Sequence, residues 1–239
     1  MSRGPAGGLS TIGFDADDTL WHNERVFRLT EERFAALLGD HAPAPDVSQR
    51  LLAAERRNLQ LYGYGIKGFT LSMIETALEL TEGRVSAAAI REILESGREM
   101  MRHPVEIFPG VRETLEALRG DFCLVLITKG DLFDQERKLA ASGLAELFHG
   151  VEIVSDKNAA TYQRLFARHG QGAERAMMVG NSVKSDILPA IEAGSWGVHV
   201  PYDITWALEH AEAPLEHPRF RRVTHVGEIA RLATEIAAS

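Results

Sequence analysis

Three aspartates lie within four positions at the end of a short apolar run near the start of the sequence. The stretch Gly13–Trp21 reads GFDADDTLW, so the apolar run ends at Phe14 and is followed by Asp15, Asp17 and Asp18. Carboxylates this close repel one another, and holding them in one turn costs stability unless a cation or a proton lies among them. The stretch therefore predicts a bound positive group at this point of the chain.

Polar residues that can bind anions or cations follow other apolar runs as well. The run Leu9–Phe14 is followed by Asp15, Asp17 and Thr19, and the run Phe122–Ile127 by Thr128, Lys129 and Gly130. The run Val151–Val154 is followed by Ser155, Asp156 and Lys157, and the run Ala176–Val179 by Asn181, Ser182 and Asp186. In open α/β sheets, ligands bind at the carboxyl ends of the strands. If these runs are parallel strands, their acids, lysines, hydroxyl and amide meet at one edge of a sheet.

The apolar runs alternate with segments of helical spacing. Each run, together with a fifth at Trp196–Val200, is predicted to be a buried strand. Between the later runs, apolar residues recur at helical spacing, and Val226–Ile236 is expected to form a closing amphipathic helix. Strand and helix in alternation predict an α/β fold, a doubly wound Rossmann-like parallel sheet.

One connection is far too long for a simple crossover. Roughly a hundred residues separate the first run from the second, whereas a crossover needs about a dozen or somewhat more. Apolar residues in this interval fall near helical spacing, as Val47 and Leu51 do, and Pro104 marks the return to the sheet. We therefore predict a small all-helical unit over residues 21–104, inserted into a core made of residues 1–20 and 105–239.

The composition argues against several classes of partner. A net charge of −8 and a pI near 5.6 disfavour nucleic acid and anionic membrane surfaces, because both require clustered Lys and Arg. No apolar stretch approaches the length of a membrane span, and the N-terminal MSRGPAGG lacks the apolar segment of an export signal. The single cysteine, Cys123, has no partner for an intramolecular disulfide. We expect a cytoplasmic protein, and the oligomeric state stays open.

These motifs resemble those of the haloacid dehalogenase superfamily of phosphohydrolases. The family pattern DxDxT is met by Asp15, Asp17 and Thr19, the second-motif hydroxyl by Thr128, the third-motif lysine by Lys157, and the fourth motif by GNSVKSDI with Asp186. The resemblance covers nearly the whole chain, including a helical cap inserted after the first strand. It implies a magnesium-dependent phosphatase that acts on a small-molecule phosphate ester.

The resemblance also implies a role for each motif residue. Asp15 would attack phosphorus to give an aspartyl-phosphate, while Asp17 would protonate the leaving oxygen and later deprotonate water. Thr128 and Lys157 would stabilise the charge on the transferring phosphoryl group. The expected ligands of Mg²⁺ are oxygens of Asp15, Asp17 (through its carbonyl), Asp186 and Asn181.

The sequence departs from the family pattern at three positions. Asn181 stands where an acid is usual, so we expect weaker metal affinity rather than loss of activity. Lys157 is not followed soon by the common proline, which keeps Lys129 and Lys138 as alternative phosphate cations. Asp18 replaces a commonly seen glycine, and the sequence offers no functional account of it.

The inserted unit carries a glycine-rich stretch, Leu61–Phe69, whose Tyr64 and Lys67 we expect to contact the substrate. Three other functions stay open. A 2-haloacid dehalogenase would share the fold but does not usually carry an acid at the position of Asp17. A phosphomutase would keep the same core residues, and Asn181 leaves room for a non-catalytic module that binds phosphate ligands.

Overall fold

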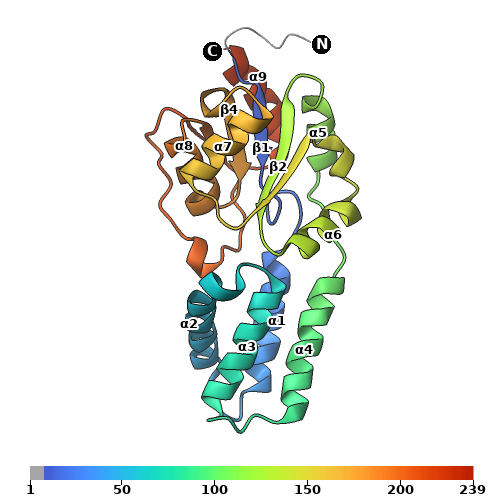
Figure 1. Ribbon diagram of the computed structural model, residues 1–239, viewed down its shortest axis with the longest axis vertical. Helices are drawn as coiled ribbons and strands as arrows, with labels where there is room; N and C mark the ends of the chain where they lie inside the picture. The colour runs from blue at the N-terminus through green and yellow to red at the C-terminus, as the bar shows by residue number, and fades with distance from the viewer. Residues whose placement is uncertain (1–7, 239) are drawn as a thin grey trace. The chain divides into compact units, whose positions relative to one another are not determined.

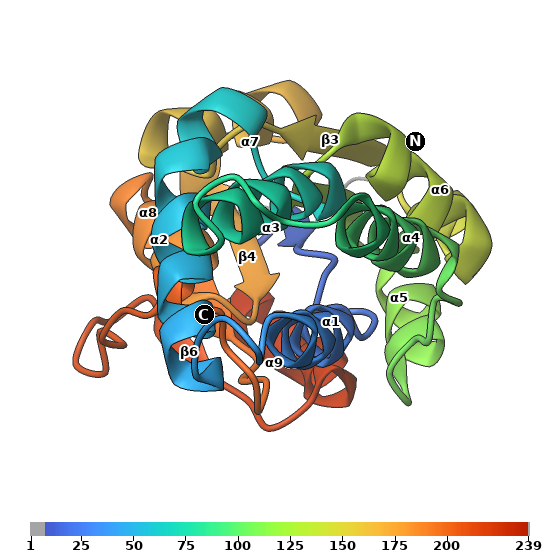
Figure 2. The same cartoon turned by 90° about the horizontal axis from the view of Figure 1, so that it is seen from below.

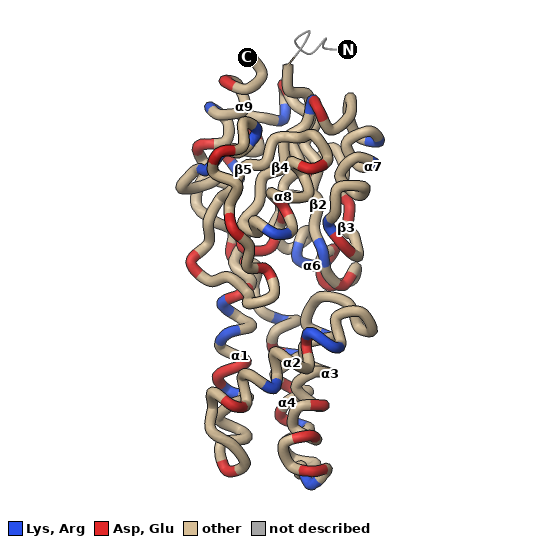
Figure 3. The backbone as a smooth tube through the Cα atoms, turned by 90° about the vertical axis from the view of Figure 1, so that its left-hand side faces the viewer, with Lys and Arg blue, Asp and Glu red and all other residues tan. Residues whose placement is uncertain are grey.

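The computed structural model describes residues 8–238, and most of the N-terminal MSRGPAGG lies outside this range. The chain divides into two units. The sheet unit contains the residues up to His22, Val105–Lys129 and the residues from Glu136 onward, while the helical unit contains Asn23–Pro104 and Gly130–Gln135. Acidic and basic residues occur along the chain of both units (Figure 3). Among the described residues, no helix is long and apolar enough to cross a membrane.

The sheet unit is built on six parallel strands (Figure 1). They are β1 (Thr11–Phe14), β2 (Cys123–Lys129), β3 (Gly150–Val154), β4 (Ala176–Gly180), β5 (Trp196–His199) and β6 (Phe220–Arg222). Their order in the sheet is β3-β2-β1-β4-β5-β6. The order reverses at β1, so the sheet is doubly wound, and the expected Rossmann-like α/β fold is confirmed.

Helices cover both faces of the sheet. The helices of this unit are α5 (Val111–Leu118), α6 (Leu132–Ser142, whose first turn belongs to the helical unit), α7 (Ala159–His169), α8 (Leu188–Glu192) and α9 (Ile229–Ala238). Alternate residues of β2 enter different cores: Leu124 and Leu126 pack with α5 and α9, whereas Val125 and Ile127 pack with α7 and α8. Because both faces are buried, the strand sequence is an unbroken apolar run.

Several predicted element boundaries differ from the structure by one or more residues, and one strand was not predicted. β2 extends through Lys129, so Thr128 and Lys129 are the last residues of the strand rather than the first residues after it. The closing helix α9 begins at Ile229 because Val226–Glu228 forms a short 3₁₀ turn. A sixth strand, β6, was not predicted, because two of its three residues are exposed arginines and the apolar signal is missing.

The helical unit consists of four helices around a core of its own. They are α1 (Glu24–Leu37), α2 (Ala44–Tyr62), α3 (Ile66–Leu80) and α4 (Ala87–Arg102). Figure 2 shows α1 and α4 nearly end on. Apolar residues at helical spacing, among them Phe34, Leu51, Met73 and Ile93, are buried together. The turn between α2 and α3 uses Gly63 and Gly65 at positive φ, a conformation that favours glycine.

Candidate active site

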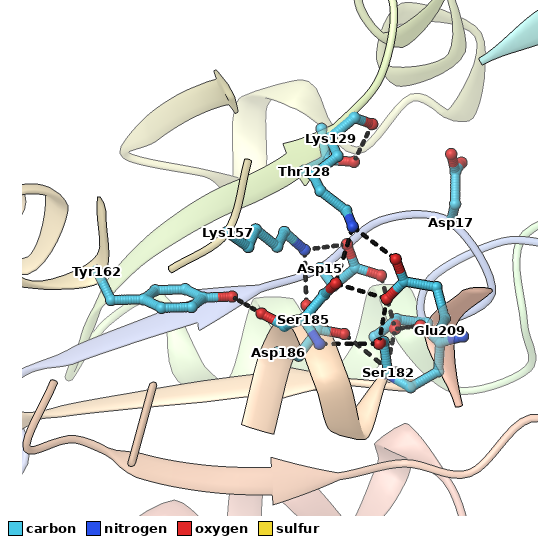
Figure 4. Close-up of polar contacts among 12 residues, drawn as sticks. Asp15, Asp17, Thr128, Lys129, Lys157, Tyr162, Ser182, Ser185, Asp186 and Glu209 are labelled. Carbon is cyan, nitrogen blue, oxygen red and sulfur yellow. Dashed lines mark hydrogen bonds and ion pairs between the residues drawn. The ribbon is translucent and has the colours of Figure 1, made fainter. Parts of the chain in front are cut away.

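The carboxyl ends of β1, β3 and β4 bring two acids and a lysine into direct contact. The Lys157 ammonium donates to Asp15 Oδ1 at 2.5 Å and to Asp186 Oδ1 at 2.7 Å (Figure 4). All three side chains are buried. We call Asp15, Lys157 and Asp186 the acid–lysine group. Two carboxylates share one ammonium, so the group as ionised carries an excess negative charge.

Burial and mutual repulsion set the protonation of this group. Desolvation and the neighbouring Asp186 raise the pKa of Asp15 to about 7, although Lys157 works in the opposite direction. Burial alone would lower the pKa of Lys157, but the two carboxylates raise it above its usual value. Lys157 therefore stays charged. The positive charge around Asp15 is too small to compensate for the burial of its ionised carboxylate, so ionisation of Asp15 is unfavourable.

A short turn after β4 positions Asp186. Val183–Ile187 forms one π-helical turn, and Asp186 Oδ2 accepts a hydrogen bond from the backbone N–H of Ser182 at 2.9 Å. A Cβ atom on Gly180, the last residue of β4, would lie 2.2 Å from Asp186 Oδ2. Only glycine leaves room there for the carboxylate, which gives the glycine of the fourth motif a physical reason.

The turn that carries the first two acids is tied to Asn181. The Thr19 hydroxyl lies 3.1 Å from Asp15 Oδ2 and 3.2 Å from Asn181 Oδ1, and it accepts the Asn181 N–H at 3.0 Å. Asn181 is thus at the site, bound to the DxDxT turn. Asp18 has a φ of 59°, in the left-handed region that favours glycine, which explains why glycine is common at this position.

The Asp17 side chain is held apart from Asp15 (Figure 4). Lys138 of α6 donates to both of its carboxylate oxygens, at 2.7 and 2.8 Å, and the Trp21 indole N–H donates to Oδ1 at 2.7 Å. Lys138, which the sequence left as an alternative phosphate cation, is therefore the ion-pair partner of Asp17. Helical spacing alone did not reveal which face of α6 this lysine occupies.

The end of β2 holds Thr128 buried beside Lys129. Thr128 does not cap the following helix, because Asp131 accepts the N–H of Asp134 in that role. Lys129 was predicted to bind substrate. In the structure its ammonium donates to Glu209 Oε1 at 2.7 Å and to Ser185 Oγ at 2.8 Å, so its charge is already paired.

Glu209 is a site residue that sequence reasoning missed. It lies in the Ala207–Glu209 turn of the irregular segment between β5 and β6, a stretch that gives no motif signal. Besides Lys129, its carboxylate accepts the hydroxyls of Ser182 and Ser185, each at 2.5 Å. Burial would raise its pKa, but Lys129 and the serine hydroxyls lower it overall, so Glu209 is ionised.

Tyr64 and Lys67 belong to the helical unit. Tyr64 lies between the two positive-φ glycines, and the Lys67 ammonium binds both carboxylate oxygens of Asp131 at 3.0 and 2.9 Å. Lys67 is half exposed in this ion pair. The predicted contact of these two residues with substrate stays a prediction.

The oxygen atoms around Asp15 fit a magnesium ion better than a transition metal. Within residues 8–238, no group of three or more His, Cys, Asp or Glu side chains is arranged to hold a metal. The carboxylates of Asp15 and Asp186 nevertheless bind the same ammonium, and the Thr19 hydroxyl contacts both Asp15 Oδ2 and the amide oxygen of Asn181. Magnesium binds through one or two carboxylates and fills its remaining positions with water and phosphate.

Comparison with known proteins agrees with this fold and identifies the family. The family model "haloacid dehalogenase-like hydrolase" matches residues 9–194. The chain belongs to this family of hydrolases.

Three similar proteins differ in their sequence identity to this chain. The pyrimidine 5′-nucleotidase YjjG of Escherichia coli is 30% identical over 195 residues, which is 77% of this chain and 82% of that protein. A haloacid dehalogenase-like family hydrolase from Xanthomonas campestris is 43% identical, with a TM-score of 0.88 over 99% of this chain and 95% of that one. The HAD-hydrolase YfnB of Bacillus subtilis, solved with bound magnesium, shares the fold at 18% identity and a TM-score of 0.66, over 95% and 99% of the chains.

Proposed function

We propose that this hydrolase is a magnesium-dependent phosphatase that cleaves small-molecule phosphate monoesters through an aspartyl-phosphate on Asp15. The observation that carries the proposal is the acid–lysine group, with a second acid, Asp17, two residues from the first. A buried carboxylate at a strand end can act as a nucleophile, and an adjacent ammonium can stabilise the phosphoryl oxygens.

In the first half-reaction, the ionised Asp15 carboxylate attacks phosphorus and the ester oxygen leaves. Lys157 orients Asp15 through its 2.5 Å hydrogen bond and supplies positive charge beside the oxygens of the phosphoryl group. Thr128 is buried at the end of β2, and its hydroxyl, which donates to the Lys129 carbonyl at 3.2 Å in the structure, would turn to donate to a phosphoryl oxygen. Asp17 gives a proton to the leaving oxygen.

In the second half-reaction, Asp17 takes a proton from water, which attacks the aspartyl-phosphate and releases phosphate. Lys138 and Trp21 hold the Asp17 carboxylate with three hydrogen bonds. These contacts suit the base, whose oxygens must be ionised. To act as the acid, Asp17 has to exchange one of these contacts for the leaving oxygen.

The Asp15 and Asp186 carboxylates, with the Asp17 carbonyl and Asn181 as neutral donors, would hold Mg²⁺. When bound, the ion acts as a Lewis acid on the phosphoryl group and offsets its negative charge. A bound ion would also offset the excess charge of the acid–lysine group, in which burial and the Asp186 carboxylate raise the pKa of Asp15. Asn181 contributes no charge, so we expect the affinity for Mg²⁺ to be modest.

Nucleoside monophosphates are the first substrates to test, because the similar E. coli protein is named a pyrimidine 5′-nucleotidase. Asp17 favours a phosphatase over a 2-haloacid dehalogenase, since displacement at carbon needs no proton donor for its leaving group. A phosphomutase would use the same core residues and would isomerise a sugar phosphate instead of releasing phosphate.

The test is phosphate release from nucleoside monophosphates, sugar phosphates and phosphoglycolate, with Mg²⁺ and with EDTA. We expect release that requires Mg²⁺ and is abolished in Asp15→Asn. Asp156→Asn is the matched control, because Asp156 is an exposed acid next to Lys157 and should be neutral.

Each alternative gives a different result in this assay. Wild-type rates in Asp15→Asn would refute Asp15 as the nucleophile. An isomer formed without free phosphate would identify a phosphomutase. Binding of phosphate without any release would identify a non-catalytic module.

A further inference from the structure

A second lysine lies beside the acid–lysine group and is neutralised by a distant part of the chain. Lys129 ends β2, and its ammonium donates to Ser185 Oγ at 2.8 Å, one residue before Asp186. Its partner is Glu209, and the side chains of the pair are only 12% and 14% exposed. In this dry setting a charge acts over a longer range than it does in water.

Ser182 contacts both the acid–lysine group and the Lys129–Glu209 pair. Its backbone N–H donates to Asp186 Oδ2 at 2.9 Å, while its hydroxyl donates to Glu209 Oε2 at 2.5 Å. Figure 4 shows Lys129, Ser182, Ser185 and Glu209 gathered beside the acid–lysine group. The Lys129–Glu209 pair is therefore an immediate neighbour of the carboxylates assigned to the metal.

The charges of the acid–lysine group and of the Lys129–Glu209 pair together set the attraction of the site for a divalent cation. Asp15, Asp186 and Lys157 sum to one negative charge when all are ionised. Lys129 alone would cancel that charge, and the attraction for a divalent cation would fall. With Glu209 in place, Lys129 contributes no net charge and its ammonium points to Glu209 and Ser185.

We propose that Glu209 is a positioning residue: by binding Lys129, it keeps a positive charge from cancelling the negative charge that the metal site needs. The inference rests on the proposed function, because it presupposes a divalent cation at Asp15 and Asp186. The inference assigns a role to the irregular segment between β5 and β6. Through Glu209 this segment sets the net charge beside the metal site, and it takes no part in the chemical steps.

Metal binding, measured without substrate, tests the inference. Mn²⁺ takes oxygen ligands as Mg²⁺ does, and electron paramagnetic resonance counts the free ion directly. We expect Glu209→Gln to weaken Mn²⁺ binding by about tenfold, the size of effect that one uncompensated buried charge has on a nearby ion. The double variant Lys129→Met/Glu209→Gln removes both charges and should bind Mn²⁺ within about twofold of the wild type, since the pair contributes no net charge.

The double variant also separates charge from structure. Glu209→Gln removes the carboxylate that Lys129 binds, so its Mn²⁺ affinity is interpreted only together with its fold, whereas the double variant removes both charges of the pair. Glu212→Gln, an exposed acid of the same segment, is the matched control and should bind as the wild type does. Circular dichroism checks the fold of each variant.

The outcomes are distinct. If the wild type binds Mn²⁺ and Glu209→Gln binds it equally well, the inference is wrong while the proposed metal site stands. If the double variant binds Mn²⁺ as weakly as Glu209→Gln does, or fails to fold, Glu209 acts by stabilising the local structure, and its electrostatic role is refuted. If the wild type itself binds no Mn²⁺, the proposed metal site is wrong and the inference fails with it.

Discussion

Asp15 is the residue on which the charge of the site depends most. Its pKa is raised to about 7 by burial and by Asp186, so the folded protein favours the protonated carboxyl over the carboxylate. A group with a raised pKa contributes its full stability below its unfolded pKa, which is about 3.9 for Asp. That contribution is lost as the pH rises through 7, unless a cation replaces the proton.

Thermal unfolding in EDTA should show this effect. Between about pH 5.5 and pH 8, we expect the melting temperature of the wild type to fall relative to that of Asp15→Asn, which cannot ionise at this position. Mg²⁺ added at the higher pH should raise the melting temperature of the wild type and leave Asp15→Asn unchanged. Parallel curves for the two proteins at both pH values would contradict the raised pKa.

Replacing Asp17 tests the proton donor. Asp17→Asn should slow the hydrolysis of an alkyl phosphate by about a hundredfold or more, the usual contribution of a general acid. The loss should be smaller for p-nitrophenyl phosphate, whose leaving group needs no proton. The measurement is the ratio of the two rates in steady-state assays. Equal losses on both esters would argue against the role of Asp17 as the acid.

Only part of the residue-level arrangement could be predicted. Asp15, Lys157 and Asp186 each follow an apolar run, and the rule that parallel strand ends converge was sufficient to place them together. Glu209 could not be found this way, because it lies in an irregular segment whose path depends on tertiary contacts. The pairing of Asp17 with Lys138 depends on the rotation of α6 about its axis, which periodicity does not fix.

At the scale of elements, the strands were predictable because they are buried on both faces. The five apolar runs correspond to β1–β5, with ends that differ by a few residues. β6 lies at the edge of the described sheet beside β5, and its two exposed arginines break the apolar pattern. Boundaries were the weakest prediction, since hydrophobicity reports burial and not the last hydrogen bond of a strand.

The turn after β4 offers a structural test of the site. Gly180→Ala would place a methyl group 2.2 Å from Asp186 Oδ2, so the carboxylate has to move. We expect a destabilisation of about 1–3 kcal/mol, typical of overpacking, together with a loss of Mg²⁺ binding. Urea denaturation and a metal titration measure the two effects. Gly120→Ala is the control, because nothing lies within 4 Å of its added methyl; equal behaviour of the two variants would contradict the packing argument.

At the scale of the molecule, the free energy of unfolding can be lowered in the helical unit without changing the proposed metal ligands, which belong to the sheet unit. Met73 is fully buried in the core of the helical unit, whereas the proposed metal ligands belong to the sheet unit. Met73→Ala should lower the free energy of unfolding by about 2–5 kcal/mol, the usual cost of such a cavity. The affinity of the folded protein for Mg²⁺ should stay unchanged.

Urea denaturation and a metal titration of Met73→Ala check this division. Leu71→Ala, on the same helix but 41% exposed, is the control and should cost far less stability. A Met73→Ala protein that is folded but has lost Mg²⁺ binding would show that the helical unit supports the metal site.

The position of β1 in the sheet has a consequence for synthesis on the ribosome. β1 is synthesised before both of its neighbours in the sheet, β2 and β4, with Thr11 opposite Cys123 and Ala176. Its two hydrogen-bonding edges therefore lack their partners until β2 (Cys123–Lys129) and β4 (Ala176–Gly180) have been translated. The helices α1–α4 make local contacts and can collapse earlier, since contacts close in sequence form fastest. Asp15, the residue proposed as the nucleophile, directly follows β1 and is thus synthesised well before the strands that flank β1.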